Sequence, residues 1–505
     1  MAMLLEFAPV AVPALGSAVY AASGWRRATV WVGTGSAVLM LGAAVVLATR
    51  VLGHGLTGPG TAGSGRLAAP GLLLVDPLSA FMLIVIGAVA VLTALATPAY
   101  LTAEITAGRA SPRTAARHNI LVQAFLAAMA LAVLAADLGV LWVAVEATTI
   151  VTAFLVGQRR GRTGVEAAWK YVVICSAGIA IALLGIVLLN YASQRTGTGA
   201  GLTWVGLTGA AAQLDPGVTR IAVVLLIVGF GTKAGLAPLH AWLPDAHSQA
   251  PAPVSALMSG VLLAVAFYTI LRVKVIADIA LGTGFTRTLL LAASLATLVV
   301  AASLLLAQRD YKRMLAYSSI EHMGLLALGA AAGGSAASAA ILLHMLGHGL
   351  AKSVLFLGAG RLLQTTGTSR IDQVRGLAGS QPVLAGCLGI GVLALIGLPP
   401  FSIFASELGI ARAGFSSGSP AVGWATALAL LIVVVIAAAL IAHTSTMLLG
   451  ASAEGPGTAT APRTLPRTSA VALVGGLVAA AAFGITAGPL STLLTAAAHT
   501  LSGAP

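Results

Sequence analysis

Ionisable side chains inside long apolar stretches are the residues of this sequence whose types and positions could do chemistry. Glu146 lies within LGVLWVAVEATTIVTAFLVG, and Lys170 opens the next apolar stretch in EAAWKYVVIC. Lys233 ends a further stretch, and Glu321 lies inside RMLAYSSIEHMGLLALG. Charged groups are costly at membrane depth and by default mark a path for ions or protons. The sequence therefore predicts such a path, although Lys170 and Glu321 could equally lie at the membrane interface.

A second group of titratable residues shares one predicted helix face. His344, His348 and Lys352 are spaced i, i+4, i+8 in LLHMLGHGLAKSVLF, so they point the same way. Histidine titrates close to neutral pH and can relay protons, while the alternative is that both histidines are structural. The i, i+4 spacing of the histidines also allows a metal site, but the carboxylate of an H-E-x-x-H motif is missing. We expect no metal.

Two of the apolar stretches are interrupted by helix breakers. Residues 228–259 read VGFGTKAGLAPLHAWLPDAHSQAPAPVSALMS around Lys233, and a second interruption, IGLPPFSIFASELG, precedes Glu407. Non-helical backbone at membrane depth is tolerated where it faces protein or water, so both interruptions favour a pathway over a lysine that merely snorkels to the interface. His240, Asp245 and His247 predict either a polar cap at the pathway entrance or a hydrated loop. The predicted breakers are Gly229, Gly231, Gly235, Pro238, Gly397, Pro399 and Pro400.

The elements that position these residues must lie in a membrane. Of the 505 residues, 58% are hydrophobic and 8% are charged, with a mean hydropathy of +1.00, whereas about a quarter of a soluble protein is charged. Apolar stretches of ~20 residues predict an all-α polytopic membrane protein with about 14 transmembrane helices, one of them bent over 382–411. Gly- and Thr-rich connections at 50–71 and 191–216 are expected to be surface loops, and 450–468 a flexible linker.

The net charge of +13 is spread over short loops, which favours orientation in a membrane over nucleic-acid binding. With the N-terminus outside, loop arginines and lysines are about twice as frequent on one side, which the positive-inside rule places in the cytoplasm. We call it the arginine-rich side, and it includes Arg109, Arg113, Arg117, Arg309 and Lys312. Two cysteines, Cys175 and Cys387, are too few for an iron–sulfur cluster or a disulfide framework. We therefore expect no cofactor in this chain.

The charged positions repeat along the chain. Glu146 and Glu321 are 175 residues apart (321 − 146), and Lys233 and Glu407 are 174 apart (407 − 233). We predict two inverted five-helix repeats, each a half-channel with a broken helix, because an odd number of spans turns the second copy over. The predicted divisions are a three-helix segment at 1–117, the repeats at 118–272 and 286–449, and a linker with a last helix at 450–505.

Several motifs resemble one family. VEATT, GFGTKAGLAPLHAWLPDAHSQAPAPVSALMSG, QRDYKRMLAYSSIEHMG, LLHMLGHGLAKSVLFLGAG and GLPPFSIFASE are similar to motifs of the antiporter-like proton-translocating subunits of complex I, Mrp-type sodium/proton antiporters and group 4 hydrogenases. The acidic Glu321, where complex I members usually read SHMG, most resembles the F subunit of hydrogenase-4-type complexes. The resemblance implies a charge pair of Glu146 and Lys233, an axis through His344, His348 and Lys352, and an end at Glu407.

The expected function follows from this resemblance. It implies a proton-translocating membrane subunit of a redox-driven complex, with the bond chemistry in partner subunits that carry iron–sulfur clusters and, in hydrogenase-like complexes, nickel and iron. The expected pathway residues are Glu146, Lys170, Lys233, His240, Glu321, His344, His348, Lys352 and Glu407. A prokaryotic inner membrane is the expected location. An Mrp-type cation/proton antiporter that moves sodium and a membrane anchor that moves no protons are the alternatives.

Overall fold

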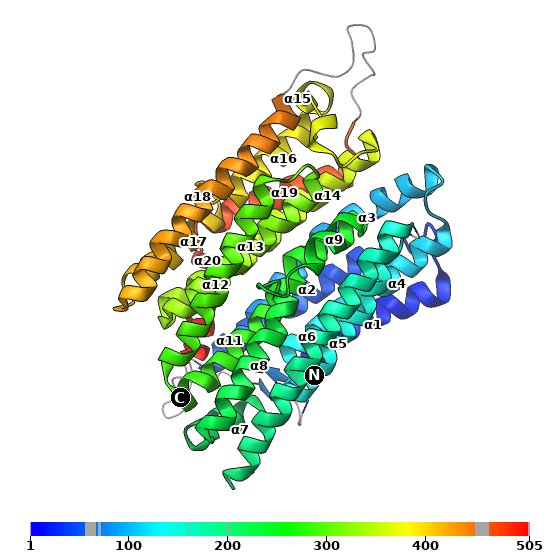
Figure 1. Ribbon diagram of the computed structural model, residues 1–505. Helices are drawn as coiled ribbons and strands as arrows, with labels where there is room; N and C mark the ends of the chain where they lie inside the picture. Colours follow the sequence, from blue (N-terminus) through cyan, green and yellow to red (C-terminus); the bar gives the residue numbers. More distant parts are fainter. Residues whose placement is uncertain are drawn as a thin grey trace.

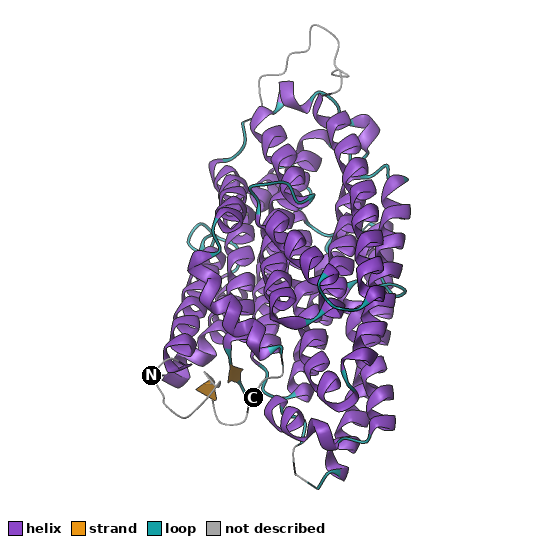
Figure 2. Cartoon of the chain, turned by 90° about the vertical axis from the view of Figure 1, so that its left-hand side faces the viewer, coloured by secondary structure: helices purple, strands orange, loops and turns teal. Residues whose placement is uncertain are grey.

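The computed structural model is described for residues 2–55, 67–68, 72–159, 161–197, 199, 201–449 and 464–502. Helices make up nearly all of this part and run roughly parallel along the long axis of the molecule (Figures 1 and 2). The only strands in the described ranges are β1 (Leu67–Ala68) and β2 (Leu74–Val75), a short antiparallel pair near one end. The expected all-α architecture is therefore confirmed.

The helices divide into long ones and short connecting ones. The long helices are α1 (Ala2–Ser23), α2 (Val32–Gly55), α3 (Pro77–Thr106), α4 (Pro112–Leu134), α5 (Leu138–Val156), α6 (Arg162–Arg195), α8 (Pro216–Ala234), α11 (Leu263–Leu281), α12 (Thr283–Leu306), α13 (Tyr311–Ala332), α14 (Gly334–Thr366), α18 (Pro420–Leu449) and α19 (Arg467–Ile485). The shorter ones are α7 (Trp204–Ala210), α9 (Trp242–Gln249), α10 (Ala252–Leu257), α15 (Leu377–Ser380), α16 (Pro382–Leu395), α17 (Ser402–Phe415) and α20 (Gly488–Thr500), with turns η1 (Ala211–Gln213), η2 (Met258–Leu262) and η3 (Ile371–Gln373).

Twelve helices of the described residues are long and apolar enough to cross a membrane, with α10, η2 and α11 counted as one continuous span, Ala252–Leu281. Helix α13 is not among the twelve, and it carries Lys312, Arg313 and Glu321. The pair α16–α17 is broken into two short helices. Counting α13 as one more span and the α16–α17 pair as another would give 14. The predicted number of about 14 spans therefore stays a prediction.

Aspartates start several of the helices. Asp76, Asp137, Asp215 and Asp310 each precede a helix and accept hydrogen bonds from backbone N–H groups of its first turn. The first turn of a helix leaves N–H groups without partners, and a short acceptor side chain satisfies them. Asp76 and Ser79 complete a capping box. These local signals place the helix starts next to apolar runs.

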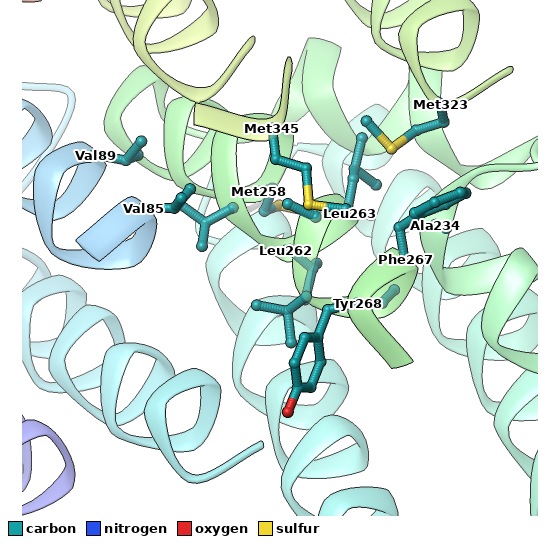
Figure 3. Packing of buried hydrophobic residues seen from close by; sticks show 14 of the residues in the cluster. Val85, Val89, Ala234, Met258, Leu262, Leu263, Phe267, Tyr268, Met323 and Met345 are labelled. Atoms are coloured by element: carbon teal, nitrogen blue, oxygen red, sulfur yellow. The ribbon is translucent and has the colours of Figure 1, made fainter. Parts of the chain in front are cut away.

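The centre of the molecule is built around the span Ala252–Leu281, which is buried from Ala252 to Val273 and partly exposed beyond it. Figure 3 shows its residues Met258 and Phe267 packed among side chains from α3, α8, α13 and α14. The outer helices behave differently, because large apolar side chains such as Trp169 and Trp424 are exposed. A lipid-facing shell therefore surrounds an enclosed central helix and its neighbours.

Two predicted connections differ from the structure. Within 191–216, α6 extends to Arg195, and α7 and η1 fold residues 204–213 into helical turns. Trp204 makes this connection ordered, because its indole donates to the Ala135 carbonyl at 2.9 Å and its ring is buried. Within 50–71, α2 continues to Gly55, while 56–66 and 69–71 lie outside the described residues. The linker at 450–463 also lies outside them.

A buried ion pair joins the start of α3 to α11 at Arg272, the predicted end of the first repeat. Arg272 lies inside α11, and its guanidinium contacts the Asp76 carboxylate at 2.6 and 2.8 Å. Tyr268, which also accepts a bond from Arg272, donates to the Val133 carbonyl. Both charges of the pair are almost fully buried. Arg272 is thus a structural residue of the interior, because α11 continues to Leu281, nine residues beyond the predicted end of the first repeat at 272.

Candidate functional site: a buried row of ionisable side chains

Lys233 lies in the last turn of α8, where the helix stops. Gly235 has φ = +81°, a left-handed conformation that only glycine adopts readily, and the chain then turns toward α9. A lysine at a helix C-terminus is favoured by the negative end of the helix dipole. The break therefore holds a cation at the point where the backbone turns.

The Lys233 ammonium is completely buried and is held by hydroxyl groups. Its Nζ donates to Thr149 Oγ1 and to Tyr171 Oη, both at 2.7 Å. Tyr171 Oη is also 2.5 Å from Thr152 Oγ1, and its ring lies 4.8 Å from Nζ. No carboxylate in the described part of the chain is within ion-pair distance of Lys233. The ammonium therefore has polar partners but no direct counter-ion.

Glu146 is a half-buried residue on α5, one turn before Thr149. Its Oε1 accepts a hydrogen bond from Ser176 of α6 at 3.2 Å, and its Oε2 has no hydrogen-bond partner among the described residues. Glu146 makes no hydrogen bond or ion pair with Lys233 among the described residues, whereas Thr149, one turn further along α5, contacts Lys233 directly. One helix turn and one hydroxyl layer therefore separate the two charges.

Gly229 and Gly231 do not loosen the helix, contrary to the sequence-based expectation. Helix α8 is continuous through both positions. At Gly229, a Cβ would lie 2.6 Å from the Ala182 amide nitrogen and 2.6 Å from the Gly178 carbonyl oxygen of α6. The missing side chain instead lets α6 and α8 pack closely, and this contact brings Tyr171 of α6 to Lys233.

The segment after Lys233 is the helix α9 and is not a hydrated loop. Trp242 is buried and donates to the Thr232 carbonyl at 2.9 Å, and its ring meets Tyr171 edge to face. His247 is also buried, stacks on Phe356 and has no hydrogen-bond partner at either ring nitrogen among the described residues. His240 precedes α9 and is half-buried. Apolar packing around Trp242 thus accompanies the burial of His247, while His240 and Asp245 of the predicted cap are half-buried.

Asp245 and Lys170 lie at the edge of this arrangement. Lys170 Nζ contacts Glu166 at 2.8 Å and Asp245 at 3.1 Å, and its side chain is exposed. Arg313 of α13 contacts the other oxygen of Asp245 at 3.1 Å. The structure does not place Lys170 among the buried residues of the row. It takes part in an ion-pair cluster that joins α6, α9 and α13.

Lys312 is a buried cation that the sequence analysis assigned to a loop. It lies in the first turn of α13, and its Nζ donates to the carbonyls of Ser248 and Ala250 at 2.7 and 2.9 Å. These carbonyls end α9, where unpaired backbone acceptors attract a cation. The neighbouring charges in QRDYKR suggested a loop, whereas α9 covers the lysine. The sequence has no proline or glycine between Lys312 and the apolar run that follows it, and this continuity indicates that Lys312 belongs to the helix.

Lys352 occupies a similar environment on α14. It is completely buried, and its Nζ donates to the Leu315 carbonyl at 2.7 Å and to Ser318 Oγ at 2.5 Å, both on α13. Glu321, one turn beyond Ser318, is also buried. As at Lys233, neutral oxygen atoms hold the ammonium and no carboxylate of the described residues pairs with it directly.

Three histidines form a cluster next to Lys352, and the sequence analysis missed one of them. His322 Nδ1 and His344 Nε2 are 3.1 Å apart, and the His348 ring centre lies 5.0 Å from that of His322. All three are fully buried. His344 and His348 share a face of α14, while His322 faces them from α13. Its only signal was its place after Glu321 in SSIEHMG.

Glu407 closes this row at the second break. Helix α16 ends at Leu395, Gly397 takes φ = +68°, and α17 begins at Ser402. Glu407 Oε2 lies against the Gly397 backbone, so that a Cβ there would be 2.2 Å away. One Glu407 oxygen lies within 4.8 Å of nitrogens of His322 and His344. These three residues could hold a metal ion, although the hydrogen bond between the two histidines already uses one nitrogen of each.

The row therefore has two parts. Lys233, Glu146 and their hydroxyl partners form one, and Lys352, the three histidines, Glu321 and Glu407 form the other. His247 lies on α9, which packs against both α6 and α13, and it stacks on Phe356 of α14. No hydrogen bond in the described part of the chain joins Lys233 to Lys352 directly. Such a fold and site define a polytopic membrane protein with ionisable groups aligned across its interior.

Comparison with known proteins places this arrangement in a family. Residues 135–451 match the family described as "NADH:quinone oxidoreductase/Mrp antiporter, TM". The "Hydrogenase-4 component F homolog" of Methylacidiphilum infernorum (isolate V4) is 40% identical over 367 residues, covering 71% of this chain and 77% of that protein. "Hydrogenase-4 component B" of Escherichia coli (strain K12) is 33% identical over 358 residues, covering 66% of this chain and half of that protein. The chain belongs to the NADH:quinone oxidoreductase/Mrp antiporter transmembrane family.

Solved structures agree with this fold. A chain of the archaeal membrane-bound sulfane sulfur reductase has a TM-score of 0.83 and 26% identity, covering 99% of this chain and 97% of that one. A chain of the Mrp complex from Dietzia sp. DQ12-45-1b has a TM-score of 0.82 and 23% identity with the same coverage. The second likeness concerns the fold alone.

Proposed function

We propose that this chain moves protons across a membrane as one subunit of a redox-driven complex, most like a group 4 membrane-bound hydrogenase or an NADH:quinone oxidoreductase. The observation that carries the proposal is the buried row from Lys233 through Lys352 to Glu407, which apolar packing alone does not require. Buried charges inside a membrane domain are expensive and mark proton relays. Similarity to hydrogenase-4 components and to NADH-quinone oxidoreductase subunits supports the same function.

The environments of Lys233 and Lys352 suit a switch between the protonated and the neutral form of each lysine. Thr149 and Tyr171 hold Lys233, and a carbonyl and Ser318 hold Lys352, so each ammonium can lose its proton without leaving a buried carboxylate unpaired. Removing one partner of a tight buried ion pair costs about 3–5 kcal/mol. Lysines with neutral partners avoid this cost, and a change in a nearby charge then decides whether they carry a proton.

The histidine cluster has a defined hydrogen-bond direction. Ser406 Oγ donates to the Ile403 carbonyl at 2.8 Å, so it accepts from His344 Nδ1 at 2.9 Å. Neutral His344 then carries its proton on Nδ1, and its bare Nε2 accepts from His322 Nδ1. A proton that reaches His322 Nε2 can thus pass along the pair toward Ser406 and Glu407. Glu321 Oε2 lies 3.7 Å from His322 Nε2 and can donate to it after a small movement.

These steps give a path with assigned roles. Glu146 and Lys233 are the charge pair of the first half-channel, Lys352 with the histidines is the central axis, and Glu407 ends the second half-channel. The two half-channels are the inverted repeats inferred from the sequence. Lys170 and His240 lie at the edge of the path, where the cluster around Asp245 links three helices.

The partners follow from the chemistry that this chain does not carry out. We infer that electron transfer takes place in other subunits, which carry iron–sulfur clusters and, in the hydrogenase-like case, a nickel–iron centre. The membrane is the inner membrane of a prokaryote. The transported ion is the proton, and sodium is the alternative that an Mrp-type antiporter would use.

The test is a comparison of matched variants in the native complex. Mild-detergent purification through a tag on this chain, followed by mass spectrometry, identifies the partners. The complex is then placed in vesicles, and proton uptake driven by its electron donor is measured for the native chain, for Lys233→Met and for Lys274→Met. Lys274 is a half-buried lysine of α11 that pairs with Asp278 outside the row. We expect Lys233→Met to lose coupled proton uptake with unchanged subunit composition, while Lys274→Met retains it.

Two outcomes would replace the proposal. If only small antiporter-type membrane subunits co-purify and uptake depends on sodium without an electron donor, the chain is an Mrp-type antiporter. If Lys233→Met and Glu407→Gln both pump normally in complexes shown to contain them, the chain is a non-pumping membrane anchor.

A further inference from the structure

A cavity of about 1180 Å³ opens between the end of α3 and helices α4, α5 and α6, and its inner end reaches the first part of the row of buried charges. Ligand pockets are typically about 300–1,000 Å³, so this cavity is large enough for part of a long molecule. Its lining changes along its length, from arginines at one end to exposed apolar side chains along the helices. The lining alone indicates an occupant with a charged end and an apolar body.

The polar end of the cavity is strongly cationic. Arg109, Arg113, Arg117 and Arg159 line it, with Glu104 as the single acidic residue. Glu104 is satisfied within the protein, because it contacts Arg109 at 3.0 Å and Arg159 at 3.6 Å. The hydrogen bonds that Arg109 donates to Glu104 raise the pKa of Arg109, which lies in the loop after α3, so it stays charged. The four arginines leave an excess of positive charge.

Arg113 and Arg117 supply the charge that remains available. They are exposed, lie one turn apart on α4, and have no ion pair among the described residues. Arg117 lies over the Phe154 ring at 5.4 Å, which holds its guanidinium above the apolar part of the cavity. The N-terminus of α4, at Ser111 and Pro112, opens at the same end and favours an anion.

An apolar, outward-facing wall makes up another part of the lining. Ile150 and Phe154 of α5 and Val165 and Trp169 of α6 line the cavity and are about half exposed or more. These side chains belong to membrane-spanning helices, so acyl chains can lie along them. Trp169, at 66% exposure, is an aromatic residue placed where such a surface meets the polar end.

We propose that this cavity binds an anionic phospholipid, with its phosphate at Arg113 and Arg117 and an acyl chain along α5 and α6. The cavity lies on the arginine-rich side, which the loop charges place in the cytoplasm, and that leaflet carries anionic lipids. The inner end of the cavity is lined by Thr149 and Ser176, the partners of Lys233 and Glu146. The lipid therefore lies next to the first half of the buried row. Its binding does not depend on the proposed function.

Fluorescence quenching can test the proposal directly. The intact complex is placed in phosphatidylcholine bilayers to which a brominated lipid is added. In one set this lipid is phosphatidylglycerol with brominated acyl chains, and in the other it is phosphatidylcholine with brominated acyl chains. The part of the quenching due to Trp169 is the difference between the native complex and its Trp169→Phe variant. We expect the brominated phosphatidylglycerol to quench Trp169 at much lower mole fraction than the brominated phosphatidylcholine.

The arginine variants supply the matched comparison. Each arginine near a membrane surface contributes about 1 kcal/mol to binding an anionic lipid, so Arg113→Gln with Arg117→Gln should lower the preference for phosphatidylglycerol on the order of 10- to 30-fold. Arg309→Gln with Arg375→Gln removes two exposed charges from the same side and should leave the preference unchanged. Arg113→Lys with Arg117→Lys should keep most of it.

Two results would overturn the proposal. Equal quenching by the two brominated lipids means that only unspecific bilayer lipid contacts Trp169. Absence of Trp169 quenching in the intact complex by either lipid means that a neighbouring membrane subunit covers the cavity. In both cases the proton-uptake assay is unaffected, so failure of this inference is distinguishable from failure of the proposed function.

Discussion

We expect a single methyl group at Gly229 to destabilise the protein, while the same change two residues later does not. A Cβ at Gly229 would lie 2.6 Å from two backbone atoms of α6, whereas a Cβ at Gly231 has its nearest neighbour, a flexible Leu236 side chain, at 3.5 Å. Overpacking costs about 1–3 kcal/mol, and replacing a helix-interior glycine by alanine returns about 0.5–1 kcal/mol. Gly229→Ala should therefore lose about 1–2 kcal/mol, and Gly231→Ala should be neutral or slightly stabilising.

The assay is thermal unfolding of both variants in the same detergent. For a chain of this size, a difference of about 2 kcal/mol corresponds to melting temperatures that differ by a few degrees. Because the shifted helix carries Tyr171, Gly229→Ala should also reduce proton uptake, whereas Gly231→Ala should not. Equal melting temperatures for the two variants would refute the close packing of α6 and α8, and with it the account of how Tyr171 reaches Lys233.

Three further predictions concern single polar contacts. Tyr171→Phe removes one of two hydrogen bonds to the Lys233 ammonium, each worth about 1.5–3 kcal/mol, so proton uptake should fall at least tenfold with no change in subunit composition. Arg272→Leu leaves Asp76 buried without its partner and should lower the free energy of unfolding by about 3–5 kcal/mol; thermal melting should show that adding Asp76→Leu recovers much of the loss. Ser406→Ala removes the acceptor that keeps the proton of neutral His344 on Nδ1, so proton uptake should slow while the melting temperature stays unchanged. Ser406→Thr should restore the rate of proton uptake.

The sequence was sufficient to predict the class of fold and part of the site, because membrane-spanning helices appear in it as long apolar runs. Lys233, Lys352 and Glu407 stand out as charges in apolar runs, and the structure buries both lysines completely and half-buries Glu407. The helix end after Lys233 could be read from Gly235, since a left-handed residue is a local requirement. Roles of these residues in proton movement remain predictions until the variants are measured.

Other parts of the site depend on contacts that a sequence does not display. Lys312 looked like a loop cation because it follows charged residues, and only the packing of α9 buries it. His322 is brought to His344 by the crossing of two helices. Gly229 was interpreted as a helix breaker, although a glycine in an apolar helix can equally mark a close helix contact. In each case the deciding partner lies on another helix, where local patterns carry no information.

The enclosed position of the span Ala252–Leu281 has a consequence for how the chain is made. This helix is apolar enough to enter the bilayer when it leaves the ribosome, yet it ends surrounded by helices on both sides of it in the sequence, including α3 and α14. This span must therefore remain exposed to lipid until the later helices are synthesised and cover it. Helix α13, which carries Lys312, Glu321 and His322, is less apolar than the twelve candidate spans. In the folded chain it packs mainly on α12 and α14, so we expect its entry into the membrane to depend on these neighbouring helices.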